Sequence, residues 1–128
     1  MTTQTVFPCI TFRDAHASFD WLERALGAER IALHEDDQGR VAHAELRIGQ
    51  STIMAGDERA GSQATPPGVS VVYVVVEDAD VAYRRARDAG ADVTEPVDQD
   101  YDSRDVTVTD LDGNRWSLGT YRGAAAAA

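Results

Sequence analysis

The sequence predicts an α+β domain in which two βαβββ modules in tandem form a curved mixed sheet with a concave cleft. An internal repeat, paired helix-boundary signals and strands with alternating polarity support this prediction. The stretches ITFRDAHASFDWLERALGAER (10–30) and VVVEDADVAYRRARDAGADV (74–93) each pass from an apolar strand to Asp, a helical stretch and Gly. The two Asp residues are 64 positions apart and the two Gly residues 63. Similarity at a fixed period indicates a duplicated structural unit.

The residues at each end of the repeated stretch predict a short amphipathic helix in both copies. Asp14 and Asp78 are good N-cap residues, because their carboxylates accept from the unpaired amides of the first turn. Gly27 and Gly90 stand where a helix ends in a left-handed residue. Between these boundaries apolar residues recur at helical spacing. These residues are Phe19, Leu22, Leu26, Ala82, Tyr83, Ala86 and Ala89.

Three extended segments are expected after each helix, with turns at Gln38-Gly39 and Gly49-Gln50 in the first copy and at Asp112-Gly113-Asn114 before the last strand of the second. They are 30–35, 40–48 and 51–55 in the first copy, and 92–97, 104–109 and 115–121 in the second. We expect a single domain over 1–123, made of repeat one (about 5–56), a polar linker (57–68) and repeat two (about 69–121). Residues 124–128 are expected to form a disordered tail.

Alternation along the strands predicts which side chains face the cleft and which lie under the helices. Cleft-facing residues are predicted to be Phe7, Cys9, Thr11, Val41, His43, Glu45, Arg47, Val71, Tyr73, Val75, Arg115 and Ser117. Core-facing residues are predicted to be Val6, Pro8, Ile10, Phe12, Ala42, Ala44, Leu46, Ile48, Trp116 and Leu118. Cys9 is an exception. Alternation places it among the cleft-facing residues, but we expect it to be a small, buried hydrophobic residue of the strand. Trp21 and Trp116 are expected in the core rather than on a ligand platform.

Composition narrows the possible functions. The 128 residues include 22 acidic and 12 basic side chains, a formal net charge of −10. This balance argues against nucleic-acid binding and is compatible with a cationic ligand. No apolar run approaches the roughly 20 residues of a membrane helix, and the start of the chain does not resemble a signal peptide, so we expect a cytoplasmic protein. All basic residues are arginine, and this absence of lysine excludes Schiff-base chemistry on a lysine side chain. Such a composition is typical of proteins from GC-rich bacterial genomes.

The duplication, together with DLDGNRWSLGT at 110–120, resembles the vicinal oxygen chelate superfamily over about residues 5–121. This superfamily includes glyoxalase I, bleomycin-resistance proteins and extradiol dioxygenases. The resemblance implies a cleft in which four side chains, usually His and Glu, hold one divalent metal. The corresponding positions carry Phe7, Met54, Val71 and Ser117, none of which is a useful ligand for such an ion. We therefore expect no metal and no cofactor. The resemblance also implies a homodimer.

His43 and Glu45 are the candidate catalytic residues. They lie two positions apart on the cleft-facing side of one strand, where Glu45 could orient His43 as a general base or the pair could begin a relocated metal site. Alternatively, His43 hydrogen-bonds Glu45 or Arg47 and only lines the pocket. His16 and His34 are expected on the solvated surface.

The remaining predicted ligand-binding residues form a mixed wall. Phe7, Met54, Val71 and Tyr73 would make its apolar part, as is typical of small-molecule sites, although a partner subunit could bury some of them. Arg115 and Ser117 would add polar groups from the last strand. Tyr101 and Arg104 precede the seventh strand, where they either close over a ligand or pin the loop to the hairpin.

Three functions follow as hypotheses. The first is a metal-independent protein that sequesters a drug-like or cationic metabolite, as bleomycin-resistance members do in antibiotic resistance. The second is a lyase, isomerase or dioxygenase that uses a relocated metal or His43 as base. The third is a small dimeric module without ligand chemistry. The expected partners are a small molecule and a second copy of the chain, without nucleic acid or membrane.

Overall fold

A computed structural model describes residues 3–124 and shows two related units in succession, βαβββ and βαββββ. The elements of the first unit are β1 (Cys9–Phe12), α1 (Ala15–Leu26), β2 (Glu29–Glu35), β3 (Val41–Ile48) and β4 (Ser51–Asp57). The elements of the second are β5 (Val71–Val75), α2 (Ala79–Asp88), β6 (Asp92–Val93), β7 (Val97–Gln99), β8 (Ser103–Thr109) and β9 (Arg115–Gly119). The α+β prediction is confirmed. Neither helix of the described chain is long and apolar enough to span a membrane.

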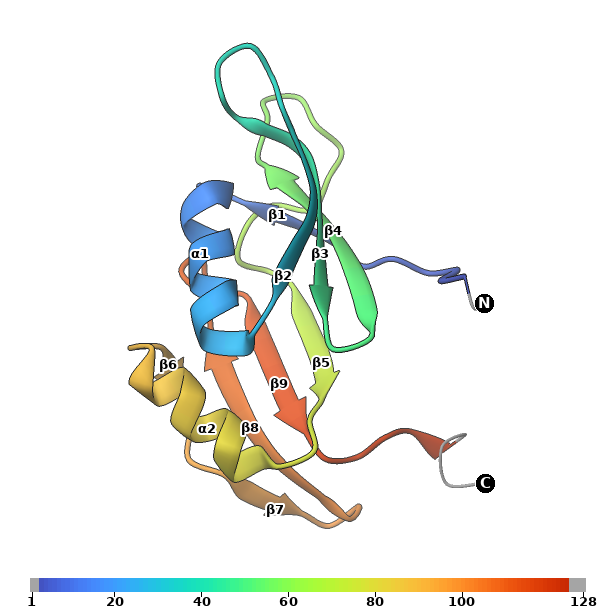
Figure 1. The fold of residues 1–128 in the computed structure, drawn as a ribbon, viewed down its shortest axis with the longest axis vertical. Helices are drawn as coiled ribbons and strands as arrows, with labels where there is room; N and C mark the ends of the chain where they lie inside the picture. The colour runs from blue at the N-terminus through green and yellow to red at the C-terminus, as the bar shows by residue number, and fades with distance from the viewer. Residues whose placement is uncertain (1–2, 125–128) are drawn as a thin grey trace.

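Each unit forms its own mixed sheet. The strand order is β1-β4-β3-β2 in the first sheet and β5-β9-β8-β6 in the second, with β7 also paired to β8. The outer strands β1 and β5 run parallel to β4 and β9, and the other pairs are antiparallel. Both helices lie on the same side of the two sheets and contact each other (Figure 1). The opposite sheet faces are therefore left without helices.

The predicted helix boundaries are confirmed. Asp14 accepts a hydrogen bond from the amide of Ala17, and Asp78 accepts from the amides of Asp80 and Val81. These contacts satisfy amides that have no partner within the helix. Gly27 and Gly90 have φ values of 72° and 82°, the left-handed conformation that ends a helix at low cost only for glycine.

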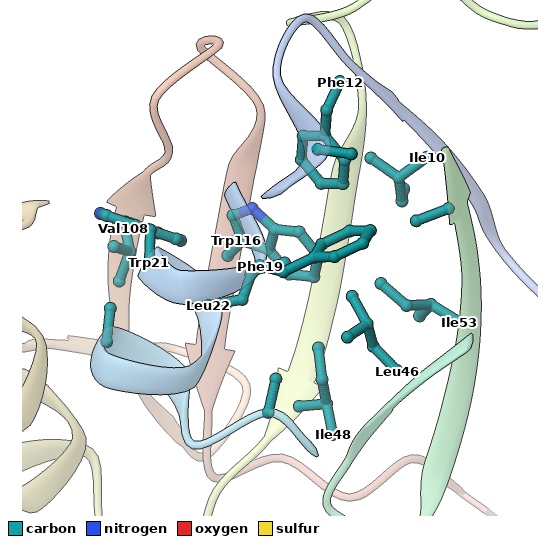
Figure 2. Packing of buried hydrophobic residues seen from close by; sticks show 14 of the residues in the cluster. Ile10, Phe12, Phe19, Trp21, Leu22, Leu46, Ile48, Ile53, Val108 and Trp116 are labelled. Carbon is teal, nitrogen blue, oxygen red and sulfur yellow. The ribbon is translucent and has the colours of Figure 1, made fainter. Parts of the chain in front are cut away.

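The core lies between the helices and the sheets, and it is densest beneath α1 (Figure 2). Phe12 and Phe19 meet edge to face with ring centroids 6.0 Å apart, a favourable aromatic geometry. Trp21 and Trp116 are 4% and 0% exposed, as predicted. Helix α1 buries six residues, whereas α2 buries only Ala79 and Ala86. The first unit therefore supplies most of the helical part of the core.

The alternation prediction was wrong at the start of β3. His34 pairs with His43, but the next residue, Glu35, pairs with Val41, so Ala42 is the extra residue of a β-bulge. The bulge reverses the predicted orientations of Val41 and Ala42: Val41 is 1% exposed and Ala42 is exposed. From Ala44 onward the predicted alternation holds.

Two further strand predictions were wrong. The segment predicted as one strand over 92–97 is divided into β6 and β7 around Pro96, which has no amide hydrogen for the ladder. Val6, Pro8 and Cys9 are exposed rather than buried, because β1 begins only at Cys9 and is an edge strand. Of the predicted tail, residues 125–128 lie outside the described part of the chain.

Candidate functional site

The helix-free face of the second sheet carries an exposed apolar and aromatic surface. Val71, Tyr73 and Val75 of β5 are 62%, 41% and 42% exposed. Between them, Val72 and Val74 pack against the core, as strand alternation requires. In register, Val71 lies beside Arg115 and Tyr73 beside Ser117. Four of the sequence-predicted ligand-binding residues therefore share this face.

The first sheet brings together a second group of predicted residues. Met54 of β4 pairs with Cys9 of β1 on one side and Glu45 of β3 on the other. The Nε2 atom of His43 lies 3.1 Å from an Oε atom of Glu45, and the His43 and His34 rings stack with centroids 6.0 Å apart. His43 is therefore held by Glu45. From the sequence, this hydrogen bond was one of several possible arrangements of His43.

Two separate hollows lie along these faces. The first, of about 310 Å³, is lined by Cys9, Thr11, His43 and Met54, with part of the loop after β4 at its side. The second, of about 630 Å³, lies between the units and is lined by the segment before β1, the β3–β4 turn and β5, including Tyr73. The two hollows share no lining residue. Within one chain, His43 and Met54 therefore lie in a different hollow from Tyr73.

Tyr101 and Arg104 have different roles in the structure. The Arg104 guanidinium pairs with Asp80 of α2 at 3.1 Å and with Asp98 at 2.9 Å, on the helix-covered side of β8. Arg104 therefore pins β8 to α2 and β7 and does not face the exposed surface. The Tyr101 hydroxyl donates to Asp105 Oδ2 at 2.8 Å, which holds the β7–β8 loop against the sheet.

Tyr73, Tyr101, Asp105 and Tyr121 form what we call the tyrosine–aspartate cluster. The Tyr73 hydroxyl donates to the backbone carbonyl of Tyr121 at 2.8 Å, and the Tyr101 and Tyr121 rings meet edge to face at 5.8 Å. Asp105 also accepts from the Ser103 hydroxyl. The sequence reasoning missed Asp105 and Tyr121. Alternation along β8 puts Asp105 on the same face as Thr107 and opposite to Val106. In the structure these two residues pair with Gly119 and Ser117 of β9 on the helix-free face.

Gly119 makes room for this cluster. A Cβ atom at position 119 would lie 2.3 Å from Asp105 Oδ1 and 2.5 Å from the Tyr73 hydroxyl. We expect Gly119→Ala to displace Tyr73 and to lower the free energy of unfolding by about 1–3 kcal/mol, as overpacking does. Urea denaturation with Gly49→Ala as a control would measure the effect. Gly49 has open space around it and a left-handed φ of +61°, so Gly49→Ala reports backbone strain without a steric clash, whereas Gly119 in β9 has no left-handed φ. No loss of stability in Gly119→Ala would contradict the steric explanation.

The positions at which the resemblance implies metal ligands carry side chains that do not suit a divalent ion. Phe7 and Met54 belong to the first unit, Val71 and Ser117 to the second, and none offers an imidazole or carboxylate. Within residues 3–124, no group of three or more His, Cys, Asp or Glu side chains is placed to hold an ion elsewhere. His43 with Glu45, and His16 with Glu35, each supply only two donors.

Comparison with known proteins agrees with the fold. Residues 5–118 match the sequence profile of the Glyoxalase/Bleomycin resistance protein/Dioxygenase superfamily. The uncharacterized protein Mb0911c of Mycobacterium bovis is 31% identical over 121 residues, covering 88% of this chain and 80% of that protein. The crystal structure of TioX from Micromonospora sp. ML1 superposes with a TM-score of 0.74 at 25% identity, covering 94% of this chain and 98% of TioX.

A second solved structure has the same fold at lower sequence identity. It is a bleomycin resistance determinant encoded on the transposon Tn5, with a TM-score of 0.71 at 17% identity, covering 94% of this chain and 100% of that protein. The duplicated unit, the sheet order and the sequence match lead to one conclusion: this chain belongs to the Glyoxalase/Bleomycin resistance protein/Dioxygenase superfamily.

Proposed function

We propose that the protein binds a small, drug-like or cationic metabolite on the helix-free sheet faces without a metal, in the bacterial cytoplasm. The observation that carries this proposal is the residue set at the family's metal positions. Phe7, Met54, Val71 and Ser117 replace charged or imidazole ligands with apolar and hydroxyl side chains. An apolar wall with a few polar groups suits an organic ligand better than an ion.

The charge of the chain supports a cationic ligand. With a formal net charge of −10, the protein attracts positively charged molecules at a distance. The activity that we propose is sequestration of the ligand, with drug resistance as its consequence, and the fold is shared with a bleomycin resistance determinant. Ligands of equal size and opposite charge would separate the contribution of charge from that of shape.

We further propose that two copies of the chain form the complete binding cleft. The two hollows of one chain are separate, and Val71, Tyr73 and Val75 are exposed beside the second. A second copy would cover Val71 and Val75 and bring His43 of one chain toward Tyr73 of the other, with the Tyr73 ring left open to the shared cleft. We expect a dimer in sedimentation velocity and a monomer for Val71→Asp, which places a charge on the covered face. A wild-type monomer at all concentrations would contradict the shared cleft.

Metal content tests the main proposal. Protein purified without chelator is expected to contain far less than one zinc, nickel, manganese or iron ion per chain. The measurement is elemental analysis of the wild type and of His43→Ala, with His16→Ala as the matched control. About one ion per chain, lost only in His43→Ala, would overturn the metal-independent function.

The hydrogen-bonded pair His43–Glu45 supports one alternative, an enzyme of the superfamily with His43 as general base. Glu45 at 3.1 Å fixes the orientation of the imidazole, as such a base requires. This function predicts turnover of a bound ligand that is lost in both His43→Ala and Glu45→Gln. Unchanged ligand recovered after incubation with the wild type would support the binding function instead.

A further inference from the structure

We propose that the tyrosine–aspartate cluster is a subsite for the positively charged nitrogen of an organic ammonium ligand. This inference rests on the proposed small-molecule function and names the part of the ligand that the second sheet holds. It depends on three features of the cluster: a buried carboxylate without a basic partner, three exposed phenol rings, and a floor without a side chain. Each is described below with the residues that create it.

The carboxylate of Asp105 is buried and lacks a cationic partner. Asp105 is 7% exposed, and its side-chain hydrogen bonds come from the hydroxyls of Tyr101 and Ser103. Among the described residues no arginine or histidine forms an ion pair with it. The neighbouring Arg104 points to the other face of β8 and pairs with other carboxylates. A buried charge without an opposite charge is costly, and a bound cation would offset that cost.

The rings around Asp105 are exposed to a ligand. Tyr73, Tyr101 and Tyr121 are 41%, 50% and 40% exposed, and hydrogen bonds fix the hydroxyls of Tyr73 and Tyr101. The faces of phenol rings attract ammonium groups, most strongly where water is partly excluded. The hydrogen bond from Tyr101 to Asp105 raises the pKa of the phenol, so Tyr101 stays protonated, and the bond also increases electron density on its ring.

The floor of the subsite is Gly119. The Tyr73 hydroxyl and Asp105 Oδ1 both approach the point where a Cβ of residue 119 would lie. The phenol of Tyr73 can therefore lie across β9 toward Asp105 only because position 119 has no side chain. Arg115, the basic residue on the same face of β9, is four positions away, about 13 Å along the strand, and leaves the negative charge uncompensated.

The test compares two molecules of the same shape that differ in charge. Acetylcholine carries a trimethylammonium group, and 3,3-dimethylbutyl acetate is its neutral carbon isostere. We expect acetylcholine to bind the full-length protein at least about tenfold more tightly than the isostere, as measured by NMR titration of the tyrosine ring resonances. Shifts are expected at Tyr73, Tyr101 and Tyr121. Equal affinity for the two probes, or no binding of acetylcholine, would overturn the subsite.

Variants identify the residues that produce the preference for the charged probe. Asp105→Asn and Tyr101→Leu are each expected to reduce the preference for acetylcholine about tenfold, whereas Tyr101→Phe, which keeps the ring, reduces it less. The matched control is Tyr83→Leu on α2, outside the cluster, which should leave the preference unchanged. Full preference in Asp105→Asn and Tyr101→Leu would overturn the assignment. A different result would contradict the proposed small-molecule function itself: no compound of any charge stabilises the wild type against heat.

Discussion

Replacing Asp110 with alanine is expected to lower the free energy of unfolding by about 3–5 kcal/mol, among the largest effects of any polar substitution. Asp110 is 7% exposed and holds the turn between β8 and β9. Its Oδ1 accepts from the amides of Asp112, Gly113 and Asn114 at 2.9–3.0 Å. Its Oδ2 accepts from the Asn114 side chain at 2.9 Å and from Trp116 Nε1 at 3.0 Å. Alanine would leave all five donors without this acceptor, and three of them, two from Asn114 and one from Trp116, are buried.

Urea denaturation of Asp110→Ala and of Asp37→Ala would measure this effect. Asp37 is an exposed turn residue, and its replacement is expected to change stability by no more than about 0.5 kcal/mol. Asp110→Asn should give an intermediate loss, because the amide retains one acceptor oxygen but turns a donor toward other donors. A loss below about 1 kcal/mol in Asp110→Ala would show that water replaces the carboxylate.

The second large effect is expected for Phe19→Ala, which should lose about 3–5 kcal/mol of stability. Phe19 is fully buried in α1 and packs edge to face on Phe12. The corresponding residue of the second unit, 64 positions later, is Tyr83, which is only partly buried on α2 beside Arg87. Tyr83→Ala is therefore expected to lose about 1 kcal/mol.

This pair of variants tests whether the duplicated units contribute unequally to the core. The two substitutions remove comparable rings from equivalent helix positions, so their difference reports the environment rather than the side chain. Denaturant melts with equal slopes would give the two free-energy changes directly. Equal losses in Phe19→Ala and Tyr83→Ala would contradict the unequal packing of α1 and α2.

The sequence predicted the repeat, the helix boundaries and most strands because these depend on local signals. Asp14 and Gly27 act within one turn of the helix that they bound, and alternation in Ala44–Ile48 follows directly from strand geometry. The bulge at Ala42 was missed because it depends on how β3 pairs with β2, which the sequence of one strand does not determine.

Prediction of the site residues was limited because their contacts join residues far apart in the sequence. Parity correctly assigned Tyr73 and Ser117 to one face, but it could not show that His43 lines a different hollow. Arg104 was ambiguous from the sequence because its partner Asp80 is 24 positions away on α2. Tyr121 was missed because its contact with Tyr73 joins residues 48 positions apart and uses a backbone carbonyl.

The most direct test of metal-independent ligand binding is a thermal melt with cationic aromatic compounds in excess EDTA. A ligand at about 100 times its Kd should add about 2.7 kcal/mol of stability. We predict the same increase in melting temperature with EDTA as without it, and no further increase when zinc, nickel, manganese or iron is supplied. A stabilisation that disappears in EDTA and returns only with a divalent metal would contradict the proposed function.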